Sequence, residues 1–249
     1  MNQRLLWLVA ASLLFGCKPS TPQDNAEAEA EQAPALNTLT DAEKKDGWEL
    51  LFDGQTTNGW HVYNRDTMEG WAVENGEMIA LGTGGLNGHG ADIVSNEKFE
   101  NFDLSLEWKV SPAGNSGVFF NVVEDPKYGA IYETAPEYQL IDDVGFPEKL
   151  EPWQHSAANY AMHPPAKSAA KPVGEFNLTR IVVNKGHVEH YLNGELIVSY
   201  DLWTPEWTAL TQSGKWKDFP DYGKAKMGPI GLQDHGNKIW FRNIKIKRL

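Results

Sequence analysis

Residues 102–110 read FDLSLEWKV, a run in which apolar and polar side chains alternate without exception. Because successive strand side chains point to opposite faces, this pattern predicts a β-strand with one face against a core and the other facing outward. Strand-like runs follow at 117–123 and 137–141. In the second of these, Glu137 and Gln139 share a face, and a carboxylate beside an amide suits a hydroxyl-rich ligand. The alternative is an edge strand with a solvated polar face.

The rest of the chain repeats short strand-like runs separated by turn signals. Asn75-Gly76 and Asn193-Gly194 each join two such runs, and an Asn-Gly pair in that position is a strong hairpin signal. Residues 202–214 have a helix pattern, and Asp41–Lys45 a short helical turn. We therefore predict an all-β sandwich or jelly roll with at most one short helix. The expected strands are 48–52, 60–63, 71–74, 77–81, 102–110, 117–123, 137–141, 176–184, 187–192, 195–200, 228–233 and 239–247.

Residues 1–17 form an apolar leader that is too short for a transmembrane helix. The leader resembles a bacterial lipoprotein signal with Leu14-Phe15-Gly16-Cys17 as its lipobox. This resemblance implies that Cys17 is lipidated and that the protein is anchored in the bacterial cell envelope, at the outer membrane or at a periplasmic or exterior face. The alternative is a signal peptide with an incidental thiol. Since Cys17 is the only cysteine, an intramolecular disulfide is excluded.

Composition divides the remaining residues into a spacer and one domain. Residues 18–46 contain three prolines, an alternating AEAEAE run and few large apolar side chains, which predicts a disordered linker. The domain is expected to span 47–249. The chain has 249 residues and a net charge of −12, which disfavours nucleic acid as a partner because nucleic-acid-binding proteins present basic surfaces.

Six sequence motifs occur together, and in order, in one known family. The chain resembles the 3-keto-disaccharide hydrolase domain over essentially all of residues 47–249. That resemblance implies a concanavalin A-like jelly-roll sandwich of two curved antiparallel sheets, with a ligand groove on the concave side. The motifs are Gly47-Trp-Glu-Leu-Leu-Phe-Asp-Gly54 with Gly59-Trp60, Gly114-Asn-Ser-Gly117, Glu137-Tyr-Gln-Leu-Ile-Asp142, Lys171-Pro-Val-Gly-Glu175, Tyr191-Leu-Asn-Gly194, and Gly231-Leu-Gln-Asp-His-Gly236 with Trp240-Phe-Arg-Asn-Ile-Lys245.

The resemblance also implies an activity, the cleavage of a glycoside or disaccharide that is already oxidised to a ketone at C3. The ketone acidifies the proton on C2, so a base removes it and the group on C1 leaves by elimination, after which water adds. This chemistry needs a base of near-neutral pKa, a proton donor for the leaving oxygen and stabilisation of an enolate. A sugar 3-oxidoreductase is then the expected functional partner, because it would make the ketone.

Motif and chemistry together give the candidate site residues. His235, His155 and Glu137 are the catalytic candidates, with a histidine expected as the base and Glu137 as base or metal ligand. The turn that holds His235 has a structural alternative, in which Asp234 holds a backbone amide. Asp142 falls on the opposite strand face from Glu137 unless a bulge intervenes. The substrate-binding candidates are Asn115, Gln139, Asp142, Tyr160 and Gln233, with Lys171 as an electrostatic partner of the enolate oxygen.

No cofactor is certain from the sequence. Glu137, His155 and His235 are a candidate ligand set for a divalent metal ion that polarises the ketone, although no short-range ligand motif supports it. The segment 143–172 reads His155-Ser-Ala-Ala-Asn159 where related proteins tend to carry a run like His-Arg-Ala-Gly-Asp. Three functions stay open, an enzyme for 3-keto-glycosides, a non-catalytic carbohydrate-binding lipoprotein on the same fold, and an ordinary glycoside hydrolase. The third needs a strand like Glu-x-Asp-x-x-Glu, which the sequence lacks.

Overall fold

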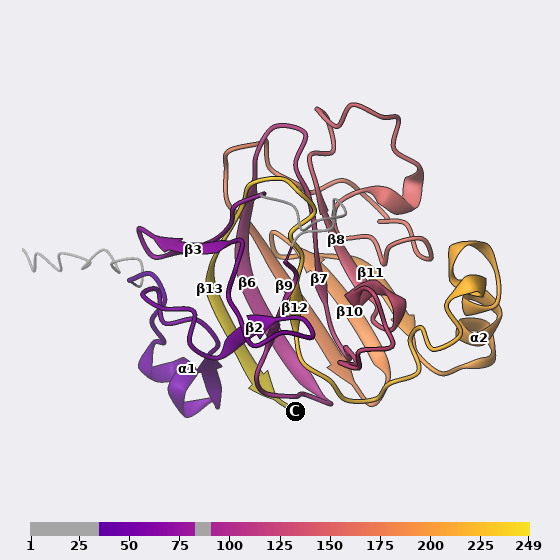
Figure 1. The fold of residues 1–249 in the computed structure, drawn as a ribbon, viewed down its shortest axis with the longest axis horizontal. Coiled ribbons are helices and arrows are strands. Elements are labelled where there is room, and N and C mark those ends of the chain that lie inside the picture. The colour runs from indigo at the N-terminus through magenta and orange to yellow at the C-terminus, as the bar shows by residue number, and fades with distance from the viewer. Residues whose placement is uncertain (1–34, 83–90) are drawn as a thin grey trace, which may run out of the picture. The chain divides into compact units, whose positions relative to one another are not determined.

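The computed structural model describes residues 35–82 and 91–249, and Figure 1 shows them as a β-sandwich. The predicted all-β fold of two antiparallel sheets is confirmed. The eight-stranded sheet contains, in spatial order, β11 (Glu195–Asp201), β10 (His187–Leu192), β9 (Asn177–Asn184), β6 (Phe102–Val110), β13 (Ile239–Arg248), β4 (Glu77–Ala80) and β3 (Trp71–Glu74), with β1 (Trp48–Leu50) also paired to β13. The five-stranded sheet contains β2 (Trp60–Val62), β5 (Ile93–Ser95), β12 (Gly231–Leu232), β7 (Asn115–Phe119) and β8 (Glu137–Ile141).

Helical structure is short but exceeds the prediction. Two α-helices occur in the described part of the chain, α1 (Asp41–Lys45) and α2 (Pro205–Thr211), so the expectation of at most one short helix is wrong. Three 3₁₀ turns accompany them, η1 (Ile131–Glu133), η2 (Pro152–Gln154) and η3 (Gly214–Asp218). No helix within 35–82 or 91–249 is long and apolar enough to cross a membrane.

The folded domain begins before residue 47. Thr40 caps α1, since its hydroxyl accepts from the Glu43 backbone N–H while the Glu43 carboxylate accepts from the Thr40 N–H. Asn37 is buried, and its backbone N–H donates to the Asn243 side chain at 2.6 Å. Residues 35–46 therefore belong to the domain, contrary to the predicted linker of 18–46. Residues 18–34 of that linker and the leader 1–17 with Cys17 lie outside the described residues.

Three strand predictions also need correction. Of the run expected at 228–233, only Gly231–Leu232 pairs, as β12. The run predicted at 117–123 pairs only as β7, because the Val123 N–H turns to the Thr134 hydroxyl at 3.2 Å instead of a neighbouring strand. The prediction omitted β5, which has only three residues and is buried throughout, so it carries no alternation.

The core lies between the two sheets and uses the apolar side of the alternating run. Phe102, Leu104, Leu106 and Trp108 of β6 are at most 1% exposed. The Trp108 indole N–H donates to the Thr179 hydroxyl at 2.8 Å, so its one polar atom is satisfied within the core.

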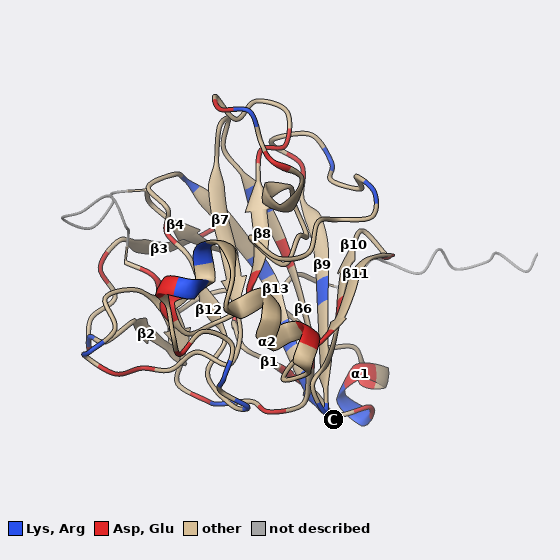
Figure 2. Cartoon of the chain, turned by 90° about the vertical axis from the view of Figure 1, so that its right-hand side faces the viewer, with Lys and Arg blue, Asp and Glu red and all other residues tan. Residues whose placement is uncertain are grey.

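The polar side of the same run forms the outward face of the eight-stranded sheet. Figure 2 shows its charged residues on β6, β9 and β13. The Arg180 guanidinium donates to both oxygens of Asp103 at 2.7 Å each. The Arg242 Nε–H donates to Glu107 at 2.8 Å. This face therefore carries hydrogen-bonded ion pairs between neighbouring strands.

Candidate active site

A cavity of about 170 Å³ lies on the outward face of the five-stranded sheet. Tyr138 and Leu140 of β8 point into the core, so Glu137 and Gln139 point the other way, toward this cavity. We call it the Glu137 cavity. Its lining residues come from six separate parts of the chain: Asn115, Tyr132, Glu137, Gln139, Tyr160, Lys215, Phe219, Gln233 and His235.

Gly117 makes room for the Glu137 carboxylate above the sheet. It faces Gln139 across the β7–β8 pair, and a Cβ atom at Gly117 would overlap the carboxylate of Glu137. In the amide orientation that satisfies its neighbours, Gln139 donates to Glu137 Oε1 at 3.0 Å and to the Ser116 carbonyl oxygen at 3.2 Å. The carboxylate is thus held in place by a neutral amide and by the absence of a side chain beneath it.

Burial raises the pKa of Glu137 from its ordinary 4.5 to about 7, and the positive charge of Lys215 opposes this rise. The residue is only 5% exposed. A carboxyl group with a pKa near 7 exchanges protons readily at neutral pH, which suits a general base or acid.

Lys215 brings a cation to the same cavity from η3. Although Lys215 is partly exposed, the ammonium group lies among aromatic rings, 4.9 Å from the Tyr132 centroid, 4.6 Å from Tyr160 and 4.7 Å from Trp216. Burial of the ammonium lowers the pKa of Lys215, while Glu137 raises it. The rings fix the position of the cation and leave it available to a negatively charged oxygen in the cavity.

The turn after β12 presents two further groups, Gln233 and His235. The Asp234 N–H donates to buried Asp92 at 3.0 Å, and Asp234 accepts from the Gly236 N–H at 3.0 Å. Burial raises the pKa of Asp92 well above its ordinary value, and repulsion from Asp234 and Glu137 adds to this. The structural alternative for this turn is therefore confirmed, since Asp234 holds a backbone amide, and the same turn brings Gln233 and His235 to the cavity lining.

Gln233 offers an acceptor that lacks a protein donor. Its Oε1 is buried and has no hydrogen-bond partner among the described residues. Buried polar atoms are normally paired, so an unpaired acceptor on a cavity wall is suited to a ligand hydroxyl group.

Tyr160 reaches the cavity because residues 156–160 run along the free edge of β8. The Ala157 N–H donates to the Gln139 carbonyl at 2.9 Å, and the Tyr160 N–H donates to the Glu137 carbonyl at 3.1 Å. Burial raises the pKa of Tyr160, and the charge of Glu137 adds to this, so its phenol stays protonated. Asn159 does not line the cavity; its amide lies 3.0 Å from His163 Nδ1.

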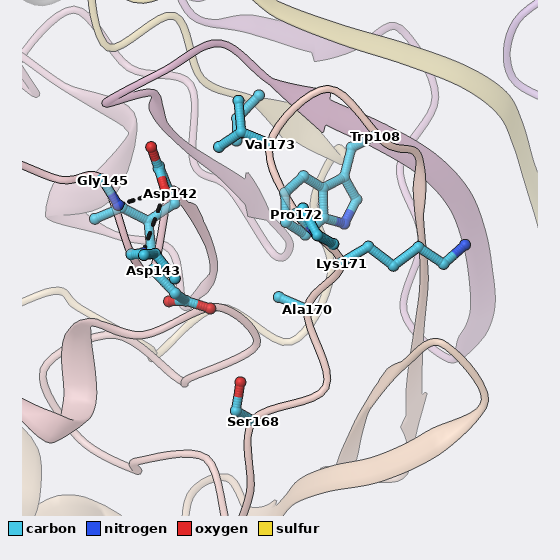
Figure 3. Close-up of a pocket in the computed structure, with 12 residues that line it drawn as sticks. Trp108, Asp142, Asp143, Gly145, Ser168, Ala170, Lys171, Pro172 and Val173 are labelled. Carbon is cyan, nitrogen blue, oxygen red and sulfur yellow. Dashed lines mark hydrogen bonds between the residues drawn. The ribbon is translucent and has the colours of Figure 1, made fainter.

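The structure brings six of the sequence-predicted site residues to the Glu137 cavity and places three elsewhere. His155 lies outside the lining, with Nδ1 3.2 Å from Asp143 Oδ1. Asp142 and Lys171 line a different cavity of about 550 Å³ that also contains Trp108, here called the Trp108 cavity (Figure 3). The six that meet are Asn115, Glu137, Gln139, Tyr160, Gln233 and His235.

Backbone groups hold the side chains of Asp142 and Lys171. Burial would raise the pKa of Asp142, but backbone N–H donors of Gly145, Ala113 and Val144 lower it below its ordinary value. The Lys171 ammonium donates to the Phe176 carbonyl oxygen at 2.9 Å, and its side chain extends away from Asp142 (Figure 3).

The candidate metal ligands are not assembled into one site. Among the described residues, no group of three or more His, Cys, Asp or Glu side chains is arranged to hold a metal ion. Glu137 and His235 share a cavity, but His155 is paired with Asp143. The divalent ion thus stays an untested prediction.

Sequence reasoning missed Lys215, Tyr132 and Phe219. Lys215 follows the predicted helix of 202–214, which ends early because α2 stops at Thr211 and η3 starts at Gly214. The one available signal was the aromatic and basic composition of Lys215-Trp-Lys-Asp-Phe219, a pattern that also suits a solvated turn.

Comparison with known proteins gives a consistent result. The model of the 3-keto-alpha-glucoside-1,2-lyase-like domain matches residues 47–247. A 3-keto-disaccharide hydrolase of Bacteroides thetaiotaomicron is 36% identical over 278 aligned positions, which cover 97% of this chain and 96% of that protein.

Solved structures of Parabacteroides distasonis proteins, described as candidate glycosyl hydrolases, share the fold. One has a TM-score of 0.81 at 41% identity and covers 86% of this chain and 100% of its own. A second has a TM-score of 0.64 at 28% identity and covers 81% of this chain and 99% of its own.

Proposed function

We propose that this chain, which belongs to the family of 3-keto-alpha-glucoside-1,2-lyase-like domains, is an enzyme that cleaves 3-keto-glycosides, including 3-keto-disaccharides. Cleavage begins with removal of the proton next to the ketone. One observation carries this proposal. A buried carboxyl group with a pKa of about 7, Glu137, shares a small cavity with the ammonium group of Lys215. Proton removal beside a ketone needs both, a base that works at neutral pH and a positive charge for the enolate oxygen.

In the first step, Glu137 takes the proton from C2 of the oxidised sugar. The electron pair of the broken C2–H bond forms a C2–C3 double bond, and the ketone oxygen becomes an enolate. Lys215 is positioned to stabilise that oxygen, a role the sequence assigned to Lys171. Asn115, Gln139 and Gln233 supply polar groups for the remaining hydroxyl groups.

In the second step, the enolate re-forms the ketone, a C1–C2 double bond forms and the C1–O bond to the leaving group breaks. The leaving oxygen takes a proton from His235 or from Tyr160, which both line the cavity. Water then adds its oxygen to C1 and gives a proton back to the group that protonated the leaving oxygen, while Glu137 returns its proton to C2, so the net reaction is hydrolysis. Glu137 thus takes the role of base that the sequence favoured for a histidine.

The test compares a 4-nitrophenyl 3-keto-glucoside with its unoxidised parent, using the purified protein with and without a chelator. We expect release of nitrophenol from the ketone alone.

The Glu137→Gln variant should lose turnover and keep its fold, and Asn115→Ala should chiefly raise KM. Equal cleavage of the unoxidised glycoside would contradict the proposal. Binding without cleavage of either substrate would support the alternative, a carbohydrate-binding module. Loss of activity with chelator would identify a metal requirement.

We also propose a lipid anchor at Cys17 and a partner oxidoreductase that oxidises the C3 hydroxyl group. The anchor is supported by the Leu14-Phe15-Gly16-Cys17 sequence, and the partner by the chemistry of the substrate. Metabolic labelling with a radioactive fatty acid tests the anchor. Label should enter the wild-type protein and be absent from Cys17→Ser, and label in both would refute the anchor.

A further inference from the structure

A third cavity, of about 490 Å³, lies in the segment 203–226, which contains α2 and η3. We call it the Lys226 cavity. Its walls are aromatic and basic, with Trp203, Trp216, Phe219, Lys217, Lys224 and Lys226 as the residues that matter here.

Positive charge distinguishes this cavity from the rest of the chain. Three of its lining residues are lysines and none is acidic, whereas the whole sequence has 34 acidic against 22 basic residues. The Lys226 ammonium lies 5.1 Å from the Trp203 ring centroid, and Lys224 lies 3.5 Å from Asp221, which is outside the lining. A concentration of cations on an acidic protein favours an anionic ligand.

The floor of the cavity is a rigid stack of rings. Tyr222 stacks on Trp216 at 3.7 Å and on Trp207 at 6.0 Å, with interplanar angles of 11° and 16°. Trp216 Nε1 and the Tyr222 hydroxyl are buried and have no hydrogen-bond partner within the described part of the chain. Because Trp216 and Tyr222 are at most 2% exposed, the stack is a fixed aromatic wall and the cations lie at its exposed side.

The Lys226 cavity adjoins the Glu137 cavity. Phe219 lines both, so its side chain forms a common wall. Lys215 and Trp216 are consecutive in η3, and the first lines the Glu137 cavity while the second lines the Lys226 cavity. The two cavities are therefore neighbours, with the Phe219 side chain between them.

We propose that the Lys226 cavity binds a carboxylate or sulfate group carried by the leaving-group side of the 3-keto-glycoside. This inference rests on the proposed function and makes it more specific, because it assigns acidic glycosides as preferred substrates. The aromatic side chains Trp203 and Phe219 would contact the apolar part of the leaving group, while Lys217 and Lys226 contact the anion.

The experiment uses two 3-keto-glucosides, with 4-hydroxybenzoate and with its neutral methyl ester as leaving groups. The variant Lys217→Ala/Lys226→Ala should raise KM for the carboxylate about tenfold at low salt and leave KM for the ester unchanged. The matched control Lys167→Ala/Lys185→Ala removes two exposed lysines elsewhere and should change neither value. Equal effects on the two substrates, or none, would overturn the inference while turnover of the ester still supports the proposed function.

A second readout does not depend on turnover. Calorimetry with the unoxidised 4-carboxyphenyl glucoside should show binding to wild type that weakens in Lys217→Ala/Lys226→Ala. If wild type cleaves neither ketone, this titration alone decides the inference, and unchanged binding in the variant refutes it. Free 4-hydroxybenzoate that binds as tightly as the glycoside would also refute it, because the cavity would then be an independent anion site.

Discussion

Asp103 and Glu137 are buried to the same extent on the outward faces of the two sheets, yet they have different partners. Asp103 is 4% exposed and receives two hydrogen bonds from the Arg180 guanidinium, which raises the pKa of Arg180. Glu137 is 5% exposed. It accepts a hydrogen bond from the neutral amide of Gln139, and the positive charge of Lys215 lowers its pKa. Burial is therefore not what separates a structural carboxylate from a reactive one.

The partner decides the chemistry of each group. A bidentate arginine fixes the negative charge of a carboxylate and joins two strands. A carboxylate with weaker partners is destabilised by burial, so its pKa rises toward neutral pH and its proton becomes exchangeable. The first arrangement stabilises a sheet, and the second is what a general base requires.

Neutralising Glu137 should abolish activity and spare stability, whereas neutralising Asp103 should do the reverse. The loss of kcat at Glu137 is the largest effect we predict. Glu137→Gln should lower kcat about 100- to 10,000-fold, the usual contribution of a general base. Its melting temperature should stay or rise, since a costly buried charge is removed. Asp103→Asn should keep kcat and lose about 1–2 kcal/mol of stability, a reduced value because Arg180 is partly exposed. Steady-state kinetics and thermal unfolding of both variants test the comparison, which fails if Asp103→Asn is the inactive one.

The pH dependence of stability should report the same group. The folded pKa of Glu137, about 7, lies above its ordinary 4.5, so the folded state holds the proton more tightly than the unfolded state. The stabilisation from this proton is full below pH 4.5 and is lost as the pH rises through 7, a difference of about 3 kcal/mol. Denaturant unfolding of wild type and Glu137→Gln between pH 4.5 and 8 should show this difference. Parallel curves would contradict the raised pKa.

Displacement of the Glu137 carboxylate should lower kcat less than its removal does. In Gly117→Ala the new Cβ overlaps Glu137, and a base moved by about 1 Å loses about 100-fold in kcat. Gly231→Ala is the matched control, because its Cβ meets the end of the Ile131 side chain instead. We expect normal kcat in the control despite a comparable loss of melting temperature. Equal loss of kcat in both variants would assign the effect to general strain.

Much of the fold could be predicted from the sequence because period-two alternation and Asn-Gly turns are local signals. The run of 102–110 became β6 with the same bounds, and Glu137 and Gln139 share a face as predicted. The short strand β5 could not be found, since three buried residues show no period.

The site was partly predictable for the same reason. Residues fixed by strand alternation or by the turn after β12 reached the cavity, including Glu137, Gln139 and Gln233. Lys215 could not be anticipated, because its proximity to Glu137 depends on how the segment after β11 folds back. His155 was misplaced because Asp143, twelve positions earlier in the chain, pairs with it.

Lys215→Met should move the pH profile of the enzyme. Lys215 lowers the pKa of Glu137, so its removal raises that pKa and shifts the rising limb of kcat/KM to higher pH. At pH 7 we expect about tenfold lower kcat/KM, part of which reflects a less stabilised enolate. Lys109→Met is the control. It removes a cation from the eight-stranded sheet that lies near Glu77 and two aromatic rings. An unshifted pH profile in Lys215→Met would show that this lysine does not influence the pKa of the base.

Lys171→Met should change kcat/KM least. This variant decides which lysine stabilises the enolate oxygen. Lys171 lines the Trp108 cavity and its ammonium group donates to the Phe176 carbonyl oxygen, whereas Lys215 lines the cavity of Glu137. We therefore expect kcat/KM of Lys171→Met to stay within about twofold of wild type at every pH, as for an exposed polar contact remote from the reaction. A loss as large as that of Lys215→Met would place the reacting sugar between the two cavities.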